Sequence, residues 1–204
     1  MIFSFFLFVY ALIYLFTTSH KDGQINLALE QQIKDLDKNY KVSTNGFRSL
    51  GDTLYNVVTN QPEIIELLYK AKHSKTEAER SLLREKLYKK MRPYFEQSLQ
   101  AGLRIMLFSF ENNRCFLRVH KPSKYNDDLS SVRYSFRYVN EKKKGVRGFE
   151  QGKISHAFRN IYPIYHDDEY LGSVDFAFSS EILQENMIRS VSYTHLTLPT
   201  KVSG

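Results

Sequence analysis

The chain begins with an apolar run, and this run constrains where the rest of the protein can lie relative to a membrane. Residues 1–16 carry no charge, and the first charged side chain is Lys21. As a helix, such a run spans roughly 24 Å, a little less than the roughly 30 Å core of a bilayer. We expect a membrane anchor over residues 1–19, with a cleaved signal peptide or a buried core helix as alternatives. A signal peptide is disfavoured because no basic residue precedes the run and no small-x-small cleavage site follows it.

Residues 20–60 carry a heptad pattern that predicts a long stalk helix. Apolar side chains recur at alternating steps of four and three, with Ser43 in the one polar slot. The series is Leu29, Ile33, Leu36, Tyr40, Phe47, Leu50, Leu54 and Val57. A seam of this length favours a homodimer through the stalk, and the alternative is a stripe that packs on the adjacent domain. Pro62 ends the helix because it lacks a backbone N–H.

Mixed periodicity follows Pro62. Helical spacing predicts a short helix over 62–71 and a long helix capped by Ser74, with Glu77 completing a capping box and Gly102 as C-cap. Alternation of period two then predicts strands. The predicted strands cover 103–110, 115–120, 146–151, 154–165 and 170–178, with a helix over 132–142 and an exit helix from Glu181. This order predicts an α+β fold, a five-stranded antiparallel sheet with helices on one face, as in PAS-like sensor domains.

Five short segments resemble the double Cache sensory domains of bacterial membrane receptors. They lie, in order, at 116–122, 127–130, 148–152, 159–164 and 171–176. The resemblance runs from about Asn45 to Leu183. It implies a sensory domain of the kind found in chemoreceptors, sensor histidine kinases and diguanylate cyclases. We expect the chain to hold only the membrane-distal lobe, without the second lobe, the second transmembrane helix and the cytoplasmic effector.

The predicted organisation has four parts. They are the anchor (1–19), the stalk (20–60), the sensory lobe (61–190) and a tail (191–204). The segment 192–201 resembles a translated sequencing adapter, so we expect the tail to be non-native, although the alternation of threonine and leucine within it also fits a strand.

Charged side chains inside predicted strands are the candidate ligand-binding residues, because such charges are either solvated or paired in a pocket. Arginines and a histidine could donate to a carboxylate, acidic groups could receive a cation or orient the arginines, and Tyr134, Tyr138 and Tyr162 could form walls. The candidates are Arg118, His120, Arg133, Arg147, Glu150, Arg159, Tyr162 and Asp175. The alternative is that Arg118–Glu150 and Arg159–Asp175 are structural cross-strand pairs.

Other chemistry finds little support in the sequence. The six histidines show no metal-ligand spacing, no nucleophile motif is present, and Asp127 with Asp128 reads as a solvated turn. The lone Cys115 fits a buried strand. The net charge of +7 suits an anionic ligand or lipid, or simply a solvated surface, whereas nucleic acid does not suit a head outside the cytoplasm.

We therefore expect a non-enzymatic sensor without a cofactor, anchored in the inner membrane with its head in the periplasm or outside the cell. Its partners would be a small anionic or zwitterionic ligand, the membrane and a second copy of the chain. The alternatives are a membrane-tethered scaffold that binds no small ligand and, less favoured, an extracytoplasmic enzyme.

Overall fold

The computed structural model describes residues 2–151 and 156–196, with the side chains of 6–151 and 156–188. The chain divides into two compact units, one comprising Met1–Val42 with Glu185–Gly204 and the other Ser43–Gln184. The predictions for the end of the tail, 197–204, and for the start of the strand expected from Ile154 lie outside the described residues.

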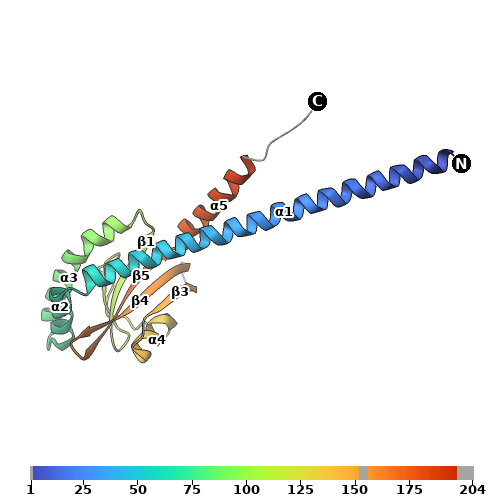
Figure 1. Cartoon of the computed structure of the whole chain (residues 1–204). Helices are drawn as coiled ribbons and strands as arrows, with labels where there is room; N and C mark the ends of the chain where they lie inside the picture. Colours follow the sequence, from blue (N-terminus) through green and yellow to red (C-terminus); the bar gives the residue numbers. More distant parts are fainter. Residues whose placement is uncertain (1, 152–155, 197–204) are drawn as a thin grey trace. The chain divides into compact units, whose positions relative to one another are not determined.

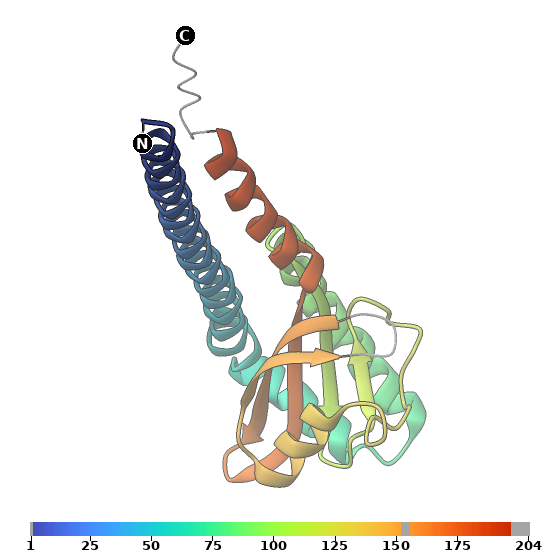
Figure 2. The ribbon, with the colours of Figure 1, turned by 90° about the vertical axis from the view of Figure 1, so that its right-hand side faces the viewer.

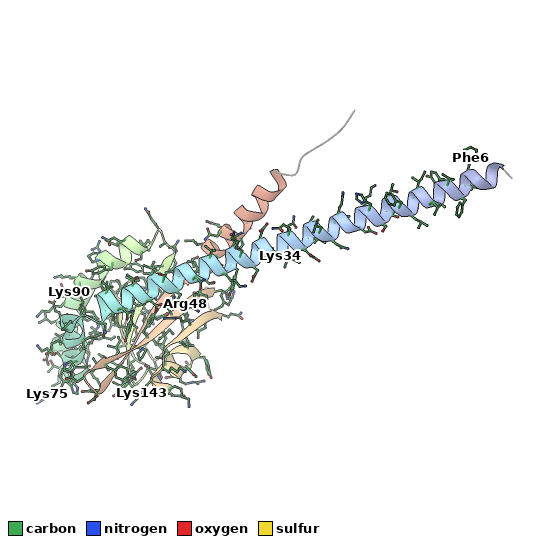
Figure 3. The ribbon with its side chains drawn as sticks, viewed as in Figure 1. Phe6, Lys34, Arg48, Lys75, Lys90 and Lys143 are labelled. Carbon is green, nitrogen blue, oxygen red and sulfur yellow. The ribbon has the colours of Figure 1, made fainter. Side chains whose placement is uncertain are left out.

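The first unit is helical. Helix α1 (Ile2–Thr53) begins here and continues into the second unit, and helix α5 (Ser180–Leu196) ends here. Phe6 lies near the start of α1 and is exposed (Figure 3). Among the described residues, no helix combines the length and apolarity needed to cross a membrane. The first five residues of the expected anchor have no described side chains.

The last turns of α1 belong to the second unit and bury the predicted apolar stripe. Phe47 and Leu54 are 5% and 4% exposed. After Thr53 the helix widens into a π-helical segment, η1 (Leu54–Thr59). A π turn holds more residues than an α turn, so the buried position moves from the expected Val57, which is exposed, to Val58.

Helices α2 (Pro62–His73) and α3 (Glu77–Ser98) follow. The predicted capping box is wrong, because Thr76 is the N-cap of α3 and accepts a hydrogen bond from the Glu79 N–H at 3.2 Å. Ser74 instead donates to the Lys70 carbonyl at the end of α2. Gly102 was predicted to be the C-cap of α3, but the helix ends at Ser98. Gly102 has a φ of +95° and lies just before the first strand of the sheet.

Five strands form one antiparallel sheet in the order β2-β1-β5-β4-β3. They are β1 (Leu103–Phe110), β2 (Cys115–Arg118), β3 (Val146–Gln151), β4 (His156–His166) and β5 (Glu169–Ser179), with helix α4 (Tyr134–Lys142) between β2 and β3 (Figure 1). The predicted α+β fold is confirmed, and the bounds of β1 and β3 agree with the prediction. Cys115 is buried as expected, and its burial raises the pKa of the thiol to about 12.

Helices cover both faces of this sheet, which corrects the expectation of one covered face. Helices α2 and α3 pack on one face, and α4 packs across β3, β4 and β5 on the other (Figure 2). Leu107, Asp175 and Ile161 are neighbours on adjacent strands. Leu107 and Ile161 pack with Phe136 and Val139 of α4 in one apolar cluster, so the α4 face has its own core.

Candidate functional site

Six of the eight candidate residues lie together on the α4 face. Strand registers place the side chains of Arg118, Asp175, Arg159 and Glu150 on that face, because alternate residues of a strand share a face. His120 follows Arg118 two residues on. Arg133, the N-cap residue of α4, is close enough to interact electrostatically with Arg159 and Asp175.

Arg159 and Asp175 form the buried centre of this group. Their exposed fractions are 2% and 0%, and Arg159 Nη1 donates to Asp175 Oδ2. Arg159 Nε lies 2.8 Å from Glu150 Oε2, although the two atoms are not aligned for a hydrogen bond. Asp175 Oδ1 is buried and has no hydrogen-bond partner within the described part of the chain. The expected Arg159–Asp175 pair is therefore present, with Glu150 as a third member.

Glu150 also fixes the start of α4. Its Oε1 accepts hydrogen bonds from the Ser135 N–H at 3.1 Å and the Ser135 hydroxyl at 2.9 Å. A carboxylate at a helix N-terminus satisfies a free N–H and faces the positive end of the helix dipole. Arg133 supplies no side-chain cap, so a carboxylate from the edge strand β3 takes that place.

Burial controls the ionisation of this group. It raises the pKa of Asp175 to about 6, with Arg159 opposing the rise and Glu150 adding to it. Burial also lowers the pKa of His120 to about 4, and the neighbouring Arg118 and Arg159 lower it further. The pKa of Arg133 is lowered by burial and then by Arg159. At neutral pH the histidine is uncharged, and Arg133 is a costly charge that an anion would stabilise.

Arg118 has a different partner from the one expected. It donates from Nη1 and Nη2 to the two oxygens of Asp127 at 2.6 and 2.8 Å, and from Nη1 to the Lys124 carbonyl at 2.9 Å. The predicted Arg118–Glu150 pair is therefore wrong, and so is the solvated reading of Asp127. The Asp128 carboxylate accepts from the Ser130 N–H, which fits the expected turn.

Arg147 and Tyr162 lie on the opposite face, away from the other six. Both donate to Asp52 near the end of α1, the tyrosine hydroxyl at 3.0 Å from Oδ1. Tyr55 stacks on Tyr162 with ring centroids 4.6 Å apart and donates to the Pro163 carbonyl. These contacts join α1 and η1 to strands β3 and β4.

A cavity of about 290 Å³ lies between α4 and the edge of the sheet. Its lining is mostly apolar, with Glu150 and Arg159 among its charged residues. The lining residues are Tyr134, Ser135, Tyr138, Val146, Arg147, Gly148, Phe149, Glu150 and Arg159. An apolar cavity with a few converging polar groups is the usual form of a small-molecule site.

Sequence reasoning missed Asp52, Ser135 and Asp127 as partners, and these three residues hold four of the candidates in place. Asp127 could have been found, because Arg118 in an otherwise apolar strand needs a carboxylate. Within the described ranges, no three histidine, cysteine or acidic side chains gather to hold a metal ion.

The fold is that of a PAS-like sensory domain. Residues 31–187, more than half of the chain, match the dCache_3 family, described as the double sensory domain of two-component sensor kinases. The chain belongs to this family. No curated protein has a significantly similar sequence.

Solved structures share the fold. The sensor domain of E. coli DcuS superposes with a TM-score of 0.52 at 12% identity, over 74% of this chain and 98% of that one. The sensor domain of the V. cholerae histidine kinase DctB gives a TM-score of 0.58 at 12% identity, over 80% of this chain and 60% of that one. The chain thus spans nearly all of the first relative and about three fifths of the second.

Proposed function

We propose that this sensory domain binds a small anionic or zwitterionic molecule in the cavity between α4 and β3, as the extracytoplasmic part of a bacterial transmembrane receptor. The observation that carries the proposal is the buried Arg159, which lines the cavity and is held by Asp175 and Glu150. A fixed guanidinium in a mostly apolar cavity is a preorganised partner for a carboxylate.

Charges of both signs favour a zwitterion. Arg159 and the nearby Arg133 would attract a carboxylate, and an anion there would offset the burial that lowers the Arg133 pKa. Glu150 lines the same cavity and would receive an amino group. Tyr134 and Tyr138 would enclose the carbon skeleton of the ligand.

Strand β3 offers a short path for the signal. Glu150 and Gly148 face the α4 side of the strand, while Arg147 reaches Asp52 of α1 from the other side. A ligand that draws α4 and β3 together would move Arg147 against α1. This requires two states that bind the ligand with different affinity, and a coupling of about 1–3 kcal/mol is typical.

The proposal also covers the organisation of the chain. It comprises a membrane anchor (1–19), a stalk (20–60), the sensory lobe (61–190) and a non-native tail (191–204). Two copies of the chain would dimerise along the apolar seam of the stalk. The receptor would be a chemoreceptor, a sensor histidine kinase or a diguanylate cyclase. The supporting observations are the apolar start of the chain and the exposed seam residues Leu29 and Ile33.

The test is a thermal-shift screen of amino acids, carboxylates and amines on the full chain in detergent, followed by calorimetry, because a ligand of the folded state raises its stability. Arg133 does not line the cavity but lies close enough to Arg159 to interact with it electrostatically, so Arg133→Gln should weaken a hit about tenfold through loss of charge attraction. Arg104→Gln, an exposed arginine on β1, is the matched control. Equal affinities in the two variants would contradict the site.

A scaffold without a small ligand is the second candidate. The observation in its favour is that the charged side chains of the site already pair with one another, as Arg118 does with Asp127 and Arg159 with Asp175. It predicts that no compound in the screen stabilises the chain.

A further inference from the structure

A second cavity, of about 240 Å³, lies between α2, α3 and the turn that joins β1 to β2. It shares no lining residue with the cavity at α4. Its polar lining includes Lys72, Arg80, Arg84, Glu111, Arg114 and Asn126. Figure 3 labels Lys75, in the connection between α2 and α3, and Lys90, on α3, which locate these two helices on the ribbon.

Arg84 is the most constrained residue of this cavity. It is 6% exposed, and its guanidinium lies between aromatic rings, 3.7 Å from the centroid of Tyr125 and 5.3 Å from that of Phe116. Nε donates to the Phe116 carbonyl at 2.8 Å, and Nη2 donates to Glu77 at 2.9 Å. The guanidinium is therefore fixed in place before any ligand arrives.

Nη1 of the same guanidinium is buried and has no hydrogen-bond partner among the residues that the structure describes. A buried charged donor without an acceptor is costly. Such a group indicates an acceptor that is not part of the chain. Tyr125, which covers Arg84, is 41% exposed, so the acceptor would enter past a surface side chain.

The other charges of the cavity have partners, which leaves Arg84 Nη1 as the donor without an acceptor among the described residues. Four cations line the cavity, namely Lys72, Arg80, Arg84 and Arg114. Three carboxylates pair with them, because Glu77 contacts Arg80 and Arg84, while Glu111 and Glu169 both contact Lys72. Asp128 is a fourth carboxylate and interacts electrostatically with Arg114, so the inference depends on the unpaired Arg84 Nη1 and not on an excess of charge. Arg114 is exposed and donates from Nη1 to the Asn126 carbonyl.

We propose that this cavity is a second ligand site, which binds a small oxyanion of the carboxylate or phosphate type. One oxygen accepts from Arg84 Nη1 and another from Arg114, in the two-point contact that guanidinium groups make with oxyanions. The volume is below the range usual for drug-sized ligands, so the ligand is a small metabolite or an inorganic ion. Binding would join α3 to the β1–β2 turn, away from the cavity at α4.

The experiment uses the full chain in detergent with sodium phosphate and, separately, sodium acetate as probes, against sodium chloride at equal ionic strength. Calorimetry gives the Kd, and the thermal midpoint reports the stabilisation expected from binding. We expect at least one of the two oxyanions to bind, and the acetate and phosphate arms decide between a carboxylate and a phosphate ligand.

Three variants make the test specific. Arg114→Gln removes one exposed donor and should weaken binding about tenfold, as expected for one charge-assisted hydrogen bond. Arg84→Gln should weaken it at least as much, with circular dichroism as the check that this buried change leaves the fold intact. Arg92→Gln removes the same charge from an exposed position of α3 and should leave the Kd unchanged.

Two results would overturn the proposal. One is that neither anion binds with a Kd below about 10 mM. The other is that Arg114→Gln and Arg92→Gln bind the probe equally well, which would mean general charge attraction. Arg133→Gln, at the other cavity, should not change the Kd of the probe, so this test is independent of the function proposed above.

Discussion

Arg159 on β4 donates to Asp175 on β5, and both side chains are buried, with Arg159 2% exposed at the cavity. A pair of this kind is rarely a net source of stability, because removing two charges from water costs several kcal/mol for each ion. Its position beside a cavity instead favours a role in recognition. Strand β3 adds Glu150 to the same guanidinium, so three strands meet at one side chain.

Replacing only one partner of the Arg159–Asp175 pair should strongly destabilise the folded state. We expect Arg159→Met to lower the free energy of unfolding by about 3–5 kcal/mol, because it leaves Asp175 buried without a counter-charge. The double variant Arg159→Met with Asp175→Leu should recover most of the loss, since both charges are then removed. Denaturant unfolding measures both effects, and Arg104→Gln should change stability by less than about 0.5 kcal/mol. A double variant that loses the sum of both single effects would contradict this account.

Asp175 and His120 should make stability depend on pH in opposite directions. The raised pKa of Asp175 means that the folded state holds its proton between about pH 4 and 6, so its contribution to stability is lost as pH rises through about 6. The lowered pKa of His120 means that the unfolded state binds more protons above about pH 4, so its contribution grows as pH rises toward 6.5. The two trends oppose each other over the same interval.

Single variants should separate the two trends. Relative to the parent, His120→Asn should lose stability as pH rises from 4 to 6.5, and Asp175→Asn should gain it, each by an amount on the order of 3 kcal/mol. Thermal midpoints at half-unit pH steps give the difference curves. Parallel curves for parent and variants would show that neither group titrates in this interval.

Gly51 should not tolerate a side chain. A Cβ there would lie 2.8 Å from the Tyr162 hydroxyl oxygen and 3.0 Å from Asn160 Nδ2. Alanine favours a helix by about 1 kcal/mol over glycine, but the clash requires the buried Tyr162 and Asn160 side chains, or α1 itself, to shift. We expect Gly51→Ala to destabilise the chain by about 1–3 kcal/mol. Gly46 has no atom within 4 Å of its Cβ position, so Gly46→Ala should be neutral or stabilising in the same unfolding assay.

Asp52 should matter for transmission and not for binding. Asp52→Asn weakens the contacts with Arg147 and Tyr162, and of these three residues only Arg147 lines the cavity, away from the Arg159 guanidinium that would hold the ligand. In a full receptor carrying this domain, we expect ligand affinity within about twofold of the parent and a clearly smaller response. An exposed change on the same helix, Asp37→Asn, serves as the control. An unchanged response would place the signal path elsewhere.

The sheet could be predicted because its signals are local. Strands β1 and β3 agree with the prediction because alternation and flanking turns are encoded within a few residues. Helix α4 could not be assigned to a face, since its apolar stripe fits either side of a sheet. The π-helical segment at Leu54–Thr59 could not be predicted from the heptad pattern either. It places Val58, and not Val57, in the core of the second unit, and that packing is not encoded in the local spacing.

The sequence predicted which residues belong to the candidate site but not which of them contact one another. Charges in strands identified Arg159 and Asp175, whereas Arg147 and Tyr162 were grouped with them although they face α1. Partners such as Asp52 and Tyr162 are 110 residues apart in sequence. Spacing along the chain carries no information on a contact of that kind.

The π-helical segment gives α1 an adjustable rotational phase. Converting one π turn back to an α turn shifts the helix by a single residue, which corresponds to a rotation of about 100° and a translation of about 1.5 Å for everything before it. Because η1 adjoins Asp52 and contains Tyr55, the residues that set this phase are also those that contact β3 and β4. The register of η1 therefore sets the angle at which the end of α1 meets the sheet.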